Sequence, residues 1–247
     1  NWKYKMIELV MSSPGATGKG TTFKSLISTT NTTGGIEKVY RDNFKGFFEI
    51  YNQTHYNNNG GMCSCDMFTL YLTLKILNPK IVIESGVWNG LSTKLIRETM
   101  GSSTIIICID PREVPPESCG GWRDTSKNTI YLTGNNFIDF GKIELNTMLR
   151  KLLPIAIYEN IQIDKDVLVF FDDHQDSVNR LLQTINLGIK NILYNDNYPL
   201  GCGSHYSLEH FFKLDNRKFC KLLEYKYKDK RDYIKNSIDP DGYFIFP

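Results

Sequence analysis

The sequence lacks any hydrophobic run long enough to cross a membrane. Its longest apolar runs, Ile105–Ile109 and Val167–Phe171, are far shorter than the roughly 20 residues of a transmembrane helix. No basic start followed by an apolar stretch and a small-residue cleavage site marks a signal peptide. We therefore expect a cytoplasmic protein with no membrane partner.

The chain also lacks an excess of charge of one sign. Its 29 Lys and Arg residues nearly balance 27 Asp and Glu residues, which leaves a net charge of +2. In the basic, aromatic stretch 213–235, lysines alternate with acidic residues, which is typical of a solvated helix. Charge therefore indicates no nucleic-acid partner, and the sequence leaves a homo-oligomer open.

Cysteine is too sparse for a disulfide scaffold. The six residues do not have the dense, even spacing of a small secreted domain: Cys63, Cys65, Cys108, Cys119, Cys202 and Cys220. A zinc site is disfavoured because the C-x-C pair has no second close pair. We expect mostly free thiols.

From residue 63 onward, short β-branched runs alternate with longer amphipathic stretches. Strands are predicted at Ile81–Glu84, Thr104–Asp110, Thr129–Thr133, Val167–Asp172, Asn191–Asn195 and Tyr243–Phe246. Helices are predicted from Met67 to Leu77 and at Phe44–Tyr51, Ser92–Met100, Ile143–Leu152 and Ser177–Leu187. This alternation predicts an α/β, Rossmann-like, doubly wound and mostly parallel sheet with helices on both faces. Residues 1–62 are interpreted as an N-terminal extension or lid, and residues 63–247 as one domain.

The first candidate site is the loop that follows the strand at Ile81. Glu84 ends this strand, Gly86 and Gly90 allow a ligand close to the backbone, and Ser92 begins a helix with exposed amides. Asp110 ends the next strand and can accept hydrogen bonds from ribose hydroxyls. A tight β-to-α turn without a ligand is the simpler alternative.

The run E-S-G-V-W-N-G, followed by Asp110, resembles the E-x-G-x-x-x-G signature of class I S-adenosylmethionine-dependent methyltransferases. The resemblance implies that the glycine loop faces the methionine part of the cofactor, that Glu84 orders the loop and that Asp110 holds the ribose. It also implies that Gly134 and Asn135 contact adenine. The dinucleotide pattern G-x-G-x-x-G is absent, which disfavours NAD.

The second candidate site combines acids from two strand ends. VLVFFDDH ends with Asp172 and Asp173, and NILYNDN ends with Asn195, Asp196 and Asn197. If both strands are parallel and joined by a crossover helix, Asp172 and Asp196 converge at one edge, where their oxygens suit Mg²⁺. The alternative is that these residues cap helices or line turns.

The same segments resemble the metal-dependent catechol and caffeoyl-coenzyme-A O-methyltransferases. The resemblance implies that Asp172, Asp196 and Asn197 are the metal ligands, with Asp173 competing for the first position. Gln175 stands where the catechol enzyme has its lysine base, so His174 and Asp173 are the candidate catalytic residues.

The order of these motifs, followed by G-C-G-S-H-Y-S, is also similar to the macrocin O-methyltransferase and cephalosporin hydroxylase groups, which favours a sugar acceptor. The predicted activity is therefore S-adenosylmethionine-dependent, Mg²⁺-assisted O-methylation of a small molecule or glycan. Two rivals remain. Ser12–Thr22 contains Gly-Lys-Gly-Thr and could form a phosphate-binding loop of a nucleotide kinase around Lys19. The fold could also serve as a non-catalytic binding module.

Overall fold

The computed structural model describes residues 9–10, 24–25, 35–54, 61–195, 208, 227–230, 233–234 and 244–246. Its strands are β1 (Leu9–Val10), β2 (Lys24–Ser25), β3 (Ile81–Ser85), β4 (Ile105–Asp110), β5 (Thr129–Thr133), β6 (Val167–Phe171), β7 (Asn191–Tyr194) and β8 (Phe244–Phe246). Its α-helices are α1 (Gly35–Thr54), α2 (Ser64–Leu77), α3 (Leu91–Met100), α4 (Leu145–Leu152), α5 (Ile155–Tyr158), α6 (Ile163–Asp166) and α7 (Ser177–Asn186).

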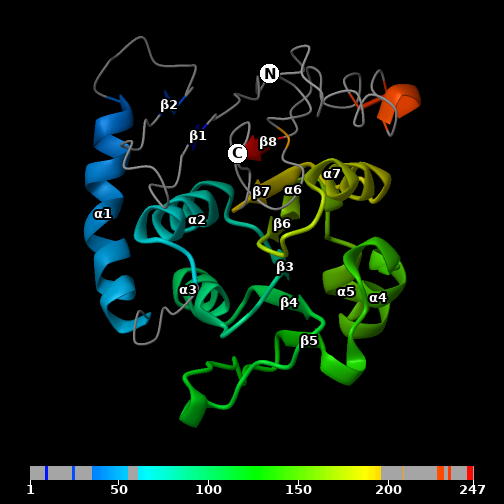
Figure 1. Ribbon diagram of the computed structural model, residues 1–247, viewed down its shortest axis with the longest axis horizontal. Helices are drawn as coiled ribbons and strands as arrows, with labels where there is room; N and C mark the ends of the chain where they lie inside the picture. The colour runs from blue at the N-terminus through cyan, green and yellow to red at the C-terminus, as the bar shows by residue number, and fades with distance from the viewer. Residues whose placement is uncertain are drawn as a thin grey trace, which may run out of the picture.

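Within the described residues, six strands form one sheet in the order β5-β4-β3-β6-β7-β8, and every neighbouring pair is parallel (Figure 1). In chain order, β3 is the first strand of this sheet. Strands β4 and β5 follow on one side of it, and β6, β7 and β8 follow on the other. This is the doubly wound strand order of dinucleotide-binding folds, in which ligands bind at the carboxyl edge where the order reverses. The predicted Rossmann-like α/β fold is confirmed.

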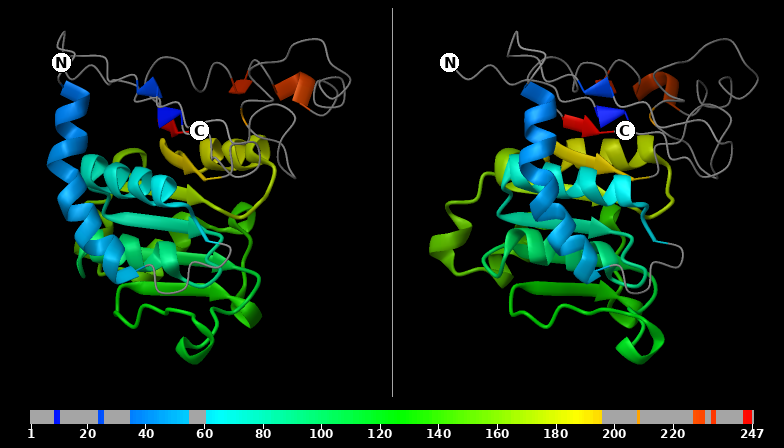
Figure 2. Two further views of the ribbon diagram at one scale, coloured as in Figure 1. Left: turned by 60° about the vertical axis from the view of Figure 1, so that its left-hand side comes forward. Right: turned by 90° about the vertical axis from the view of Figure 1, so that its left-hand side faces the viewer.

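Helices cover both faces of this sheet (Figure 2). Alternate strand residues, such as Val82, Ile106 and Leu168, pack in one core cluster with α2 and α3. Their neighbours, such as Ile83 and Val169, pack in a second cluster with α4 and α7. The central strands β3, β4 and β6 are buried along their whole length, which explains why they are continuous apolar runs.

Helix α1 forms a further layer outside α2 and α3 (Figure 1). It is longer than the predicted helix at Phe44–Tyr51 because it extends over Gly35–Thr54. Phe47 is buried, with its ring centroid 4.9 Å from that of Phe68 on α2. Lys94 Nζ on α3 also donates to the carbonyl oxygen of Gln53, at 2.8 Å. This part of the predicted extension therefore shares a core with the sheet domain.

Helix ends follow local sequence signals. Asn78 ends α2 in the left-handed conformation, with φ of 46°. Asp176 caps α7, where its side chain accepts from the amides of Val178 and Asn179. A glycine follows α7, as is common at helix C-termini: Gly188 has φ of +72°, and its amide donates to the carbonyl oxygen of Ile185 at 3.0 Å.

In the part of the chain that the structure describes, no helix has the length and apolar character needed to cross a bilayer.

Candidate functional site

The predicted site residues gather at the carboxyl edge of the sheet, because β3, β4, β5, β6 and β7 all run in the same direction. Helix α2 runs back from this edge to the start of β3, so its first turn also lies there (Figure 2).

Glu84 is fully buried near the end of β3 and ties that strand to α3. Its two carboxylate oxygens accept from the hydroxyls of Ser92 and Thr93 in the first turn of α3, and its Oε2 lies 3.7 Å from the Cys108 thiol. Burial raises the pKa of Glu84 to about 7, although the hydrogen bonds act in the opposite direction. Ser92, predicted as a cofactor contact, directs its hydroxyl to Glu84.

Asp110 orders the loop between β3 and α3. One of its oxygens accepts from the amides of Val87 and Trp88, both at 3.0 Å. The other accepts from the amide of Arg112 at 2.8 Å and from the Arg112 guanidinium at 3.4 Å. Burial alone would raise the pKa of Asp110, but the amides of Arg112, Trp88 and Val87 hold it below its ordinary value.

The loop glycines are required by the packing of the chain on itself. Gly86 has φ of +94°, and a Cβ atom there would lie 2.1 Å from the backbone oxygen of Asp172. A Cβ atom on Gly90, with φ of +81°, would lie 1.9 Å from the backbone oxygen of Trp122. A side chain at either position would therefore collide with the protein backbone, so both positions require glycine.

The predicted adenine contacts lie after β5 in a short 3₁₀ turn, Gly134–Asn136. Asn135 is exposed, whereas Gly134 packs against the side chain of Glu113. Glu113 also accepts from the hydroxyl of Thr133 at 3.0 Å and pairs with Arg123 at 3.2 Å. The turn is thus held by residues that follow β4.

Asp172 and Asp173 directly follow β6 but have different surroundings. Asp173 accepts from the Ser85 hydroxyl at 2.7 Å and pairs with Arg180 at 2.8 Å. Arg180 is buried and also pairs with Asp139 at 3.0 Å. Asp173 is thus bound into a network that joins the ends of β3 and β6 to α7.

Asp172 faces the end of the neighbouring strand. Its Oδ1 accepts from the side-chain nitrogen of Asn195 at 2.9 Å, which follows because β6 and β7 pair in parallel with Phe171 opposite Tyr194. The next two predicted ligands, Asp196 and Asn197, lie outside the described residues. Among the described residues alone, no group of three or more His, Cys, Asp or Glu side chains could hold a metal ion.

His174 is exposed and has a φ of +53°, which is uncommon for a residue with a side chain. It lines a shallow recess together with Gln175, Arg180 and Tyr194. Phe171, which also lines this recess, belongs to the core cluster on the α7 side of the sheet.

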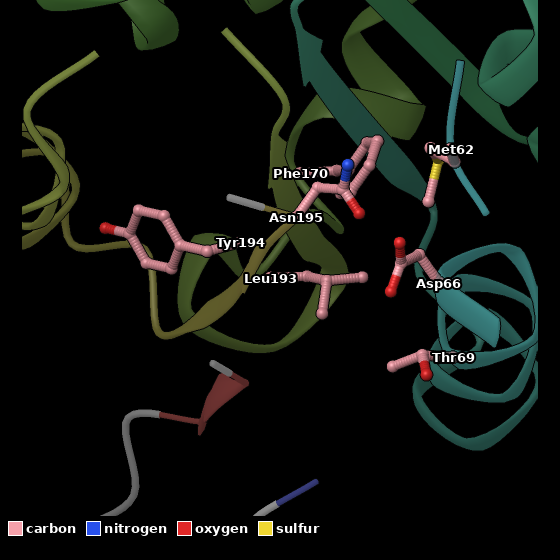
Figure 3. Close-up of a pocket in the computed structure, with 7 residues that line it drawn as sticks. All are labelled: Met62, Asp66, Thr69, Phe170, Leu193, Tyr194 and Asn195. Atoms are coloured by element: carbon pink, nitrogen blue, oxygen red, sulfur yellow. The ribbon is translucent and has the colours of Figure 1, made fainter. Parts of the chain in front are cut away.

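A second, shallow recess lies between α2 and the ends of β6 and β7 (Figure 3). It is lined by Met62, Asp66, Thr69, Phe170, Leu193, Tyr194 and Asn195. Figure 3 shows the Asp66 carboxylate pointing into it. The sequence analysis missed Asp66, although its position in the first turn of a helix that leads into β3 is a signal that places it at this edge.

Cys63 holds the backbone around Asp66. Its thiol donates to Asp66 Oδ2 at 2.9 Å. Burial, with the nearby Asp66 carboxylate, raises the pKa of Cys63 to about 12, so the thiol stays protonated and can donate. Cys63, Cys65, Cys108 and Cys119 are all free thiols, as predicted, while Cys202 and Cys220 lie outside the described residues.

Comparison with protein-family models found no match, and comparison with curated protein sequences found no significant match either. A functional assignment must therefore be argued from the residues of this chain.

Proposed function

We propose that this chain is an S-adenosylmethionine-dependent, Mg²⁺-assisted O-methyltransferase. The observation that carries the proposal is the contact between Asp172 and Asn195 at the edge that also holds the glycine loop. Two polar strand ends and a loop ordered by an acid lie together there. In a doubly wound sheet, this is the edge where ligands bind.

On the cofactor side, Asp110 is the central residue. A carboxylate offers about four lone-pair positions, and the longest of its four contacts is the one from the Arg112 guanidinium, at 3.4 Å. We expect ribose hydroxyls to replace this contact while the three amides keep the loop in place. Trp88 is 45% exposed beside it and offers an apolar surface to a cofactor or acceptor.

On the metal side, the proposed ligands are Asp172, Asp196 and Asn197. Carboxylate and amide oxygens suit Mg²⁺, and Asn195 fixes the orientation of Asp172. When bound, the cofactor supplies an electrophilic methyl group, and the metal ion lowers the pKa of an acceptor hydroxyl. His174 is the proposed proton acceptor, through an imidazole nitrogen, since Asp173 is paired with Arg180.

The proposed acceptor is a sugar hydroxyl, and the proposed location is the cytoplasm. The two rival functions differ from this one in what they bind. A nucleotide kinase would use Lys19, which lies outside the described residues, and would bind ATP. A non-catalytic module would give no methyl transfer.

Calorimetric titration with S-adenosylmethionine, with and without Mg²⁺, tests the proposal. We expect saturable binding that Asp110→Ala weakens at least about 10-fold, because the ribose contact is lost along with the order of the loop. Asp164→Ala is the matched control, since Asp164 lies on α6 before the start of β6 and only approaches Lys190 at 4.0 Å. No cofactor binding at any Mg²⁺ concentration would refute the proposal.

Turnover tests the metal ligands separately. Methyl addition to a panel of sugars and phenols is read by intact mass. Asp196→Ala should keep its affinity for S-adenosylmethionine and lose turnover. Turnover at the wild-type rate in this variant would contradict the proposed role of the metal ion.

A further inference from the structure

Asp110 is almost completely covered, although it lies at the edge of the sheet where ligands bind. Its side chain is 3% exposed. One oxygen accepts from the amides of Val87 and Trp88 in the glycine turn, and the other accepts from the amide of Arg112, all at 2.8–3.0 Å. A ligand can therefore reach this carboxylate only if one of its neighbours moves.

The side chain of Arg112 is the neighbour that is most easily moved. Its guanidinium makes the longest contact to Asp110, with Nε 3.4 Å from Oδ1, and the side chain is 61% exposed. Exposed side chains change rotamer within nanoseconds. The amides, in contrast, belong to the backbone, and Gly90 of the glycine turn packs on the backbone of Trp122. A ligand would thus reach Asp110 by displacing the Arg112 side chain.

Arg112 also covers the indole ring of Trp88. Its guanidinium carbon lies 4.3 Å from the ring centroid, which is a cation–π contact. Trp88 is 45% exposed and has φ of 50°, an uncommon value for a residue with a side chain, and its amide is bound to Asp110. One flat hydrogen-bond donor therefore lies on the ring and against the carboxylate at the same time.

A ligand that takes the place of this guanidinium must have the same two properties. It must donate hydrogen bonds to a carboxylate, which can only accept, and it must offer a surface that packs on an indole ring. A ribose has both, because its hydroxyls donate and its C–H groups pack on aromatic rings. In a doubly wound sheet, the acid at the end of the second strand, here Asp110 on β4, is where ribose hydroxyls bind.

We infer that the Arg112 side chain competes with the ribose of a ligand for Asp110 and Trp88, and so lowers the affinity of this site for ribosides. The inference rests on the proposed function, in which Asp110 binds the ribose of S-adenosylmethionine, and it adds a regulating residue to that site. Binding must break an exposed ion pair and an exposed cation–π contact. Such contacts are weak, so together they reduce riboside affinity by roughly 5- to 30-fold.

Calorimetric titration of the full chain with adenosine tests this inference. Arg112→Ala should bind adenosine roughly 5- to 30-fold more tightly than the wild type, because no side chain then competes for Asp110. The affinity for 2′,3′-dideoxyadenosine should rise less, since this nucleoside lacks the two hydroxyls that would bind the carboxylate. An unchanged midpoint of urea unfolding establishes that the variant remains folded.

Arg150→Ala is the matched control. Arg150 is also exposed and also lies over an aromatic ring, with its guanidinium carbon 5.2 Å from the ring centroid of Tyr158. It is in the last turn of α4 and has no contact with the glycine turn. This variant should therefore bind adenosine as the wild type does.

The ¹⁹F NMR signals of 5-fluorotryptophan give a direct view of the Trp88 ring. Among Trp2, Trp88 and Trp122, the Trp88 signal is assigned by its loss in Trp88→Phe. Adenosine should shift this signal in the wild type. Arg112→Ala should shift it before any ligand is added, because the guanidinium that covers the ring is gone.

Three outcomes overturn the inference. One is that Arg112→Ala binds adenosine no more tightly than the wild type; a weaker affinity would mean that Arg112 contacts the ligand instead of competing with it. The second is an equal gain for adenosine and 2′,3′-dideoxyadenosine, which would mean that the hydroxyls do not bind Asp110. The third is that neither protein binds adenosine.

Titration of the same two proteins with S-adenosylmethionine separates this inference from the proposed function. Cofactor binding that is equally tight in the wild type and in Arg112→Ala would reject the competition alone. Adenosine binding that tightens in Arg112→Ala, without any binding of S-adenosylmethionine, would keep the competition and reject methyl transfer.

Discussion

Glu84 is a carboxyl group held away from water between β3 and α3. Its partners are hydroxyls and a thiol rather than a cation. Such a group costs free energy when it is charged. Its pKa of about 7, against an ordinary value of 4.5, therefore makes the stability of the protein depend on pH.

We expect Glu84→Gln to remove this dependence. Since the pKa is higher in the folded protein than in the unfolded chain, unfolding releases a proton between about pH 4.5 and about pH 7. The stability of the wild type relative to the variant should thus fall as pH rises through this interval, by a total of about 3 kcal/mol. Above about pH 7, the difference in stability between the two proteins should be constant.

Urea unfolding of both proteins across this interval measures the difference. Parallel stability curves would mean that Glu84 titrates normally, and that its burial is less complete than the structure describes.

Asp172 and Asp173 mark the limit of what adjacent residues reveal in a sequence. The pattern D-D after a buried strand predicts acids at the sheet edge, and both lie there. Their partners differ: Asp173 is bound by Arg180 and Ser85, whereas Asp172 accepts from Asn195. No sequence pattern links Ser85 or Arg180 to Asp173. The different surroundings of the two aspartates can therefore be seen only in the folded structure.

At the scale of elements, the turn between β3 and α3 is held by contacts to two other loops. Gly86 packs on the backbone of Asp172 after β6, and Gly90 on that of Trp122 after β4. Each approach leaves no room for a side chain. The turn, the acidic segment and the loop after β4 therefore pack closely against one another.

Gly86→Ala should be far more damaging than an alanine at another left-handed glycine. We expect a loss of at least about 3 kcal/mol, because a Cβ atom would overlap a backbone atom that cannot move alone. Gly188 has φ of +72° with nothing within 4 Å of a Cβ atom, so Gly188→Ala should cost only about 1–2 kcal/mol of backbone strain. Equal losses in urea unfolding would contradict the described packing.

Most elements of the sheet could be predicted from the sequence because their signals are local. Buried parallel strands are continuous apolar runs, and all six predicted strands are present with ends shifted by at most a residue. The predicted crossover between β6 and β7 is also present, as α7. Missed elements, such as α5 and the 3₁₀ turns, are short and lack a periodic pattern.

The candidate site was only partly predictable. Acids at strand ends are visible in the sequence, because the carboxyl ends of parallel strands share an edge. Asp66 and the recess it lines were missed, since they arise from the packing of α2 against the ends of two strands that come about a hundred residues later. The exact filling of the glycine turn by the protein backbone was missed for the same reason.

At the scale of the whole molecule, α1 joins the predicted extension to the sheet domain. Phe47 packs between α2 residues, with ring centroids 4.9 Å from Phe68 and 5.6 Å from Tyr71. Phe48, one residue later, is 49% exposed. The two residues therefore form a matched pair for testing whether α1 and the sheet unfold together.

Phe47→Ala should lower the midpoint of a single unfolding transition and cost about 3 kcal/mol, as expected for a buried phenylalanine. Phe48→Ala should change stability by less than about 1 kcal/mol. Far-UV circular dichroism during urea unfolding measures both. A separate early transition in Phe47→Ala, with the main midpoint unchanged, would make residues 1–62 an independent unit.

Strand β3 pairs with a near neighbour in the chain and with a remote one. Ile81 lies opposite Ile105 on one side and opposite Val167 on the other. Closing the longer loop costs about 1 kcal/mol more conformational entropy than closing the shorter one, and distant pairings of this kind slow folding. The turn at Gly86 also leaves the ribosome well before Asp172, on whose backbone it packs. We therefore expect the contact between the β3 turn and the end of β6 to form late in folding.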